Sequence, residues 1–141
     1  TDPSRRIAID LERPHDGIVA ADDVWFTTVD GHVVRARLGE DRVTEVHDLN
    51  RLAGEGYALG WCRGLAVLGE GRVVVGFSRL RPTRFRENVR WVKHRLGLAA
   101  APGNLPCRIA GFDVRAGRRE WEVDLEPHGL AAVFSIHPES G

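Results

Sequence analysis

The sequence has no methionine, a single lysine and only two cysteines among its 141 residues. The cysteines, Cys62 and Cys107, form no CxxC pair and no metal-ligand spacing, so the sequence gives no sign of a zinc site or a redox pair. Nineteen of the 20 basic residues are arginine, which a GC-rich coding bias explains at least as well as anion recognition does. We therefore expect two buried, reduced thiols and no metal site.

Net charge and long hydrophobic runs are also missing. The 20 basic residues are balanced by 20 acidic ones, which gives no argument for nucleic acid or an anionic membrane as a partner. No apolar run approaches the roughly 20 residues that span a bilayer, and residues 1–6 do not resemble a signal peptide. We expect a soluble protein of one domain, with the cytoplasm favoured, and the missing methionine suggests a segment of a longer chain.

What the sequence does contain is a series of short apolar runs separated by tight polar turns. The first four runs are predicted strands at 17–21, 24–29, 32–38 and 42–49. Aspartate and glycine in the turns between them supply the conformations that hairpins require. Similar runs recur at 61–68, 71–78, 108–114 and 119–125. A four-stranded unit repeated at about 40 residues is typical of a β-propeller, in which each unit forms one blade.

The predicted fold class is all-β: one β-propeller segment with an inserted α-helix. Complete blades are expected at 15–49 and 61–125, with the outer strand of a preceding blade at 1–11 and the start of a following one at 126–141. A closed propeller has about four to eight blades, and we expect six or seven here. The remaining blades would come from a longer chain or from homo-oligomerisation.

The second blade is interrupted by an insertion at 79–105 that carries the one charge run of the sequence. Residues 79–95 hold seven basic side chains and one acidic side chain. Apolar residues at helical spacing predict an amphipathic helix, with Arg86, Arg90 and Lys93 along one flank. This helix either docks an anionic ligand or partner, or packs on the propeller edge with its arginines solvated.

Polar, titratable residues stand at the three predicted blade entries, where propellers build their binding sites. These candidate ligand-binding residues are His15, Asp16, Cys62, Arg63 and His128. The histidines suit acid–base chemistry, while Arg63 can hold a carboxylate or pair with Asp16 of the adjacent blade. The alternative is that all five only fix the register between blades. Trp25, Trp61 and Trp121 are expected to pack between blades.

The first repeat resembles a known family. PHDGIVAADDVWFTTVDGHVVRARL at 14–38, followed by VTEVHDL at 43–49, is similar to one repeat of the streptogramin-lyase and NHL type of β-propeller. Pro127 to Leu130 (PHGL) repeats only its entry. Repeats of this kind occur in lyases, lactonase-like hydrolases and binding modules, so the resemblance implies the fold more than an activity.

Two functions follow as hypotheses. The first is a scaffold that binds a small molecule or a protein partner at the blade entries. The alternative is a metal-assisted lyase or lactonase-like hydrolase, for which the resemblance implies a divalent metal and roles for His15 and His128. No nucleophile or phosphate-binding motif is present in the sequence.

Overall fold

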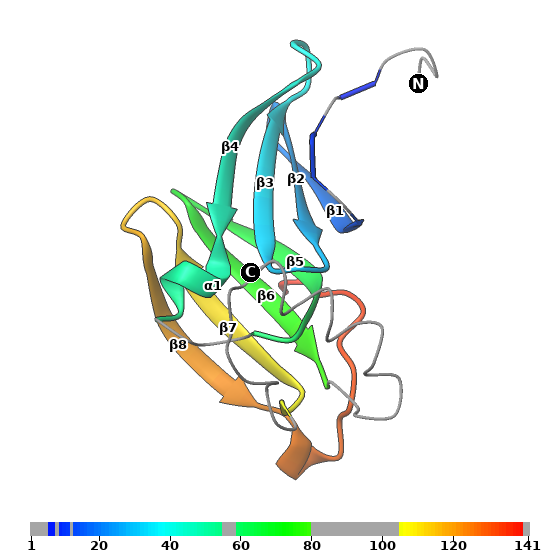
Figure 1. Ribbon diagram of the computed structural model, residues 1–141, viewed down its shortest axis with the longest axis vertical. Helices are drawn as coiled ribbons and strands as arrows, with labels where there is room; N and C mark the ends of the chain where they lie inside the picture. Colours follow the sequence, from blue (N-terminus) through cyan, green and yellow to red (C-terminus); the bar gives the residue numbers. More distant parts are fainter. Residues whose placement is uncertain (1–5, 8, 12, 55–58, 80–104, 140–141) are drawn as a thin grey trace.

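The chain is described by a computed structural model that covers residues 6–7, 9–11, 13–54, 59–79 and 105–139. It is mostly β structure, arranged as two antiparallel four-stranded sheets. The first sheet lies above the second in Figure 1. The described residues also form one short helix, α1 (Leu49–Leu52), and a 3-10 turn, η2 (Glu126–His128).

The first sheet contains β1 (Pro14–Ala20), β2 (Asp23–Thr28), β3 (His32–Arg37) and β4 (Arg42–Asp48), in that order across the sheet. These bounds confirm the four predicted strands to within a few residues. More and less buried residues alternate along β1 and β4 because successive residues point to opposite faces of the sheet. All three turns use left-handed backbone, at Ala21, Gly31 and Asp41, which turns the chain tightly between antiparallel strands.

The second sheet repeats this arrangement with β5 (Trp61–Gly69), β6 (Arg72–Ser78), β7 (Arg108–Asp113) and β8 (Arg118–Asp124). The four strands predicted for the second repeat are thus confirmed as well. The predicted inserted helix falls between β6 and β7, largely within 80–104. It lies outside the described residues, together with Arg86, Arg90 and Lys93.

The main core lies between the two sheets, where β5 contacts both β1 and β2. Its largest buried side chains include Phe77 and Phe112, whose rings meet edge to face with centroids 6.3 Å apart. Trp25 is buried in this core, as predicted. Trp121 is not between the sheets: it lies on the outer face of the second sheet, packs on Gly111 and is 41% exposed.

Each sheet has an outer face that the other sheet does not cover. On the first sheet, Ile7, Ile9 and Leu11 pack against a small cluster around Phe26 and Val34. On the second sheet, residues 131–136, named here the C-terminal strap, cross the outer face beside β5 and β6 (Figure 1). Neither terminal segment forms a strand within its described residues, although a strand was predicted at 5–11. Both outer faces therefore keep exposed apolar side chains, namely Val19 and Val46 on one and Trp121, Val123 and Phe134 on the other.

The helices within the described part of the chain are too short or too polar to cross a membrane.

Candidate functional site at the strand-entry end

The starts of β1 and β5 lie at the same end of the two-sheet stack, named here the strand-entry end. The last residues of β2 and β6 also lie at the strand-entry end, because Thr28 pairs with Pro14 and Ser78 pairs with Trp61. The sheets are joined here by a backbone hydrogen bond from Cys62 N to Val29 O at 3.4 Å. The predicted entries of the first two repeats are therefore neighbours in space.

Asp16 makes a direct link between these two entries. Its carboxylate accepts a hydrogen bond from the backbone N of Leu65 at 3.0 Å, and its own backbone N donates to the hydroxyl of Thr27 at 3.3 Å. Both strands carry a β-bulge at this point, before Gly17 in β1 and between Arg63 and Leu65 in β5. A bulge redirects a side chain away from the regular alternation, so the backbone itself turns the Asp16 carboxylate toward the second sheet.

Arg63 does not pair with Asp16, so that predicted possibility is wrong. Arg63 pairs in register with Gly76, on the face of β5 that turns away from the first sheet. Its guanidinium lies over the ring of Phe134, 5.4 Å from the ring centroid. The Nε–H group is buried and has no hydrogen-bond partner in the described chain. A buried guanidinium donor without an acceptor is uncommon because its desolvation is uncompensated.

The C-terminal strap is held over this position by close packing and by backbone polar groups. Val133 sits on two glycines: a Cβ on Gly76 would lie 2.4 Å from Val133 Cγ1, and a Cβ on Gly64 would lie 2.9 Å from the same atom. The Ser78 hydroxyl accepts from Val133 N and donates to Val133 O, both at 3.1 Å. Sequence reasoning missed this element; the glycines in adjacent strands were its only signal.

Cys62 is fully buried within the core, and its thiol is not available to a ligand. Burial raises the pKa of this thiol, and the nearby negative charge of Asp30 raises it further. The thiol is therefore protonated across the physiological range and packs as a small apolar side chain. This location favours the structural alternative for Cys62 over a role in binding.

A compact polar network closes the turn between β2 and β3 at the same end. The Thr28 hydroxyl donates to the Asp30 carboxylate, which also lies 3.2 Å from His32 Nδ1. Burial acts to raise the pKa of Asp30, but its hydrogen bonds with His32 and Thr28 outweigh that effect and lower it. Although threonine, aspartate and histidine come together here, Thr28 is fully buried and gives its proton to Asp30 rather than to His32. The network stabilises the turn and has no exposed nucleophile.

The two histidines predicted as catalytic candidates occupy different surroundings. His15 is exposed near the start of β1 at the strand-entry end. His128 is exposed at the end of η2, which follows the outer strand β8. No hydrogen bond links the two histidines in the described structure. Within the same residues, no three His, Cys, Asp or Glu side chains are grouped so that they could hold a metal ion.

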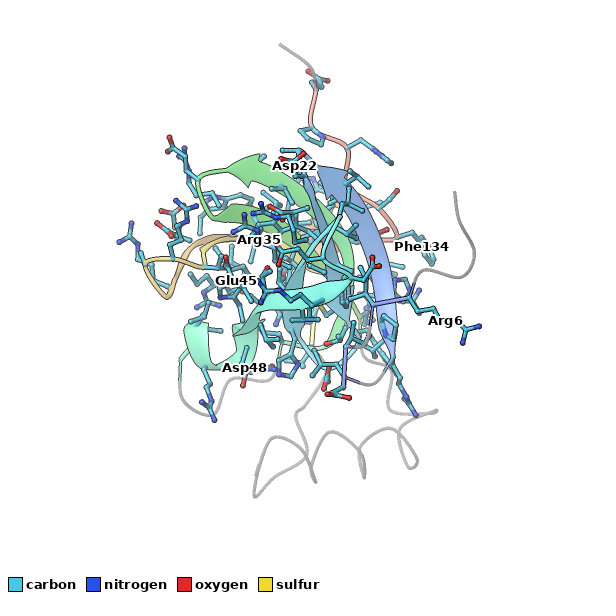
Figure 2. All side chains as sticks on the ribbon, turned by 90° about the horizontal axis from the view of Figure 1, so that it is seen from above. Arg6, Asp22, Arg35, Glu45, Asp48 and Phe134 are labelled. Carbon is cyan, nitrogen blue, oxygen red and sulfur yellow. The ribbon has the colours of Figure 1, made fainter. Side chains whose placement is uncertain are left out.

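The longest set of charged contacts lies elsewhere, on the face of the first sheet that carries Trp25. Arg35 donates to Asp23 at 2.6 Å and to Glu45 at 2.5 Å, and Glu45 in turn contacts His47 at 3.0 Å. Figure 2 shows Arg35 and Glu45 next to each other, with Phe134 on a different side of the molecule. The hydrogen bonds from Arg35 are the main reason that the pKa of Asp23 is lowered. Every member of this set has a partner, which indicates a structural role.

Fold and site together define an all-β protein of two packed antiparallel meanders, with a polar seam where their first strands meet. Comparisons with protein-family models, with curated proteins and with solved structures found no match to this chain.

Proposed function

We propose that this chain is a β-propeller segment that serves as a binding scaffold, with the strand-entry end as its binding face for a small molecule or a protein partner. The proposal for the fold is supported by two successive meanders of identical strand order that pack through their first strands. Residues 14–38 also resemble a repeat of the NHL type. Further blades, from a longer chain or from other copies, would cover the apolar side chains on both outer faces.

The proposal for binding depends on one observation, the hydrogen bond from Leu65 N to the Asp16 carboxylate. This bond joins the entries of the two sheets, so that residues 49 positions apart in sequence contribute to one polar surface. His15 is exposed beside it and is free to meet a ligand. Such a convergence of polar groups at the edge of an apolar core is typical of ligand sites.

The alternative of a metal-assisted lyase or hydrolase gains no specific support from these positions. His15 lies near the start of β1 and His128 at the end of η2, and no hydrogen bond joins them within the described residues. We therefore propose binding rather than catalysis.

The propeller proposal is tested by the solution mass of the 141-residue chain, measured by light scattering, together with urea unfolding. We expect either a discrete oligomer or a poorly folded, aggregating chain, because two blades leave apolar faces uncovered. A monodisperse monomer with cooperative unfolding would overturn the proposal, since the two sheets would then be sufficient alone.

The binding proposal is tested by screening small acids, sugars and nucleotides for a rise in the melting temperature of the protein. The screen uses the oligomeric state that unfolds most cooperatively. A compound that stabilises the protein is expected to lose about tenfold in affinity with His15→Ala, the loss of roughly one hydrogen bond. The matched control is His128→Ala, which removes another exposed imidazole, beyond β8 at the edge of the second sheet opposite to β5. Equal losses in both variants, or no stabilising compound, would contradict binding at the strand-entry end.

A further inference from the structure

Arg63 differs from the other buried arginines of the described chain. Five other arginines in the described residues are partly or fully buried, and each forms an ion pair with a carboxylate: Arg35, Arg37, Arg79, Arg108 and Arg119. Arg63 is also partly buried, but it forms no ion pair with a described residue and its Nε–H has no acceptor. The fold therefore holds one partly buried guanidinium in place without the carboxylate partner that each of the others has.

Arg108, in the same sheet, is a buried arginine whose guanidinium N–H groups have hydrogen-bond acceptors. It donates to Leu59 O at 2.7 Å, to Pro106 O at 3.3 Å and to Glu122 at 3.2 Å, and it lies 5.3 Å from the ring of Phe77. Arg63 has the aromatic contact, with Phe134, but none of the acceptors. What Arg63 lacks is an oxyanion acceptor, such as a carboxylate or phosphate, whose oxygens match the planar set of N–H donors of a guanidinium.

The surroundings keep Arg63 in one orientation and leave it reachable. The C-terminal strap is fixed by Val133 on Gly64 and Gly76, so the adjacent Phe134 is placed over the guanidinium. A ring stacked on the face of a guanidinium leaves the N–H groups in its plane free to donate. The Nε atom of Arg63 is buried, but the side chain as a whole is only partly buried and Phe134 beside it is 67% exposed, so the rest of the guanidinium lies near the surface.

We propose that Arg63 is an oxyanion-binding residue, which takes a carboxylate or phosphate group of a small molecule against the Phe134 side of the second sheet. Arg63 lies on the outer face of the second sheet, so this inference goes beyond the proposed binding face at the strand-entry end and does not depend on it. Phe134 orients the guanidinium and covers one side of the bound group.

The test is an NMR titration of the 141-residue chain with inorganic phosphate and, separately, with acetate, at constant ionic strength. The Nε–Hε signal of Arg63 reports directly on the group without an acceptor. We expect this signal to shift and saturate, with a dissociation constant in about the millimolar range. Arg63→Lys keeps the charge but loses the fork, and should weaken binding about tenfold. Phe134→Leu should weaken it several-fold, and its exposed position makes a folding defect unexpected.

The matched control is Arg115→Gln, which removes an exposed arginine that also forms no ion pair with a described residue. Phosphate binding that survives this change but is lost with Arg63→Gln supports the proposal. Equal weakening in both variants would mean general attraction to positive charge and would overturn it. An Arg63 signal that does not move with either anion also overturns it, whether or not the variants fold.

A third outcome separates a small molecule from a protein carboxylate. If neither anion shifts the Arg63 signal but Arg63→Gln abolishes an oligomer seen by light scattering, the acceptor belongs to another copy and the small-molecule proposal is wrong. The result is also distinct from failure of the scaffold proposal. A chain that is a stable monomer can still bind phosphate at Arg63, and a chain that assembles as expected can fail to bind it.

Discussion

The two sheets share a strand order but differ in how their charged groups are satisfied. In the first sheet, Asp23, Arg35, Glu45 and His47 are linked in a continuous row across three strands. In the second sheet, the face turned away from the first carries apolar side chains around Trp121 and one arginine without an acceptor, Arg63. The comparison teaches that the repeated backbone does not repeat its chemistry. The complete pairing in the first sheet is structural, while the incomplete pairing at Arg63 in the second sheet is where we place oxyanion binding.

The largest expected effect comes from the contrast between two arginines of the second sheet. Arg108 is 1% exposed and holds two backbone carbonyls and Glu122. Arg108→Ala leaves a cavity at the largest fully buried side chain and removes the donor to the buried Leu59 carbonyl, and should lower the free energy of unfolding by about 2–5 kcal/mol. Arg63→Gln removes a donor that has no acceptor, and should be neutral or slightly stabilising without an anion. Urea unfolding followed by tryptophan fluorescence measures both; losses of similar size would remove the distinction between the two arginines.

The next effect concerns the charged row of the first sheet. Asp23→Asn weakens the hydrogen bonds from Arg35 and Arg37, and should cost about 1.5–3 kcal/mol. Because the pKa of Asp23 is lower in the folded protein, the unfolded chain takes up its proton first as the pH falls. The stabilisation from Asp23 is therefore complete above about pH 4 and is lost as the pH falls through the folded pKa. Urea unfolding from pH 6 to pH 2.5, roughly, should show a smaller decline for the variant; an unchanged pH profile would count against this role.

The smallest effect tests how the strap is seated. Gly76→Ala introduces a Cβ that would meet Val133, and should cost about 1–2 kcal/mol by displacing the strap. Gly39→Ala is the control, because a Cβ there has no neighbour within 4 Å. Thermal unfolding gives the stability, and the Arg63 Nε–Hε signal shows whether Phe134 has moved away. A Gly76→Ala protein as stable as Gly39→Ala would mean that the strap does not hold the site.

The strands were predictable because the pattern that defines them is local. Alternation of period two, with Asp and Gly at the turns, places β2, β3 and β4 close to their observed bounds. A strand needs a neighbour for its backbone hydrogen bonds, and alternation alone does not supply one. That is why the apolar alternation at Ile7, Ile9 and Leu11 leads to packing on the first sheet without a strand in the described residues.

The site was predictable only in part, for a similar reason. The sequence placed Asp16 and Arg63 at neighbouring entries, and the hydrogen bond from Leu65 N to Asp16 agrees with that. It did not show that the bulges in β1 and β5 send the two side chains to different faces. Phe134 and Ser78 had no motif that marked them, because their importance comes from packing between segments more than 50 residues apart in sequence.

The two outer faces, described above by their exposed apolar side chains, are different surfaces. Suppose that the outer face of the first sheet in one copy meets the outer face of the second sheet in another copy. The contact is then head-to-tail and has no two-fold symmetry. An open assembly joined in this way still has one free face of each kind, one at either end. Growth by such contacts ends only when the rotation between neighbours brings the last copy back to the first; otherwise it continues as a filament. The angle between the two sheets, rather than the strength of their contact, would therefore decide between a ring and a fibre.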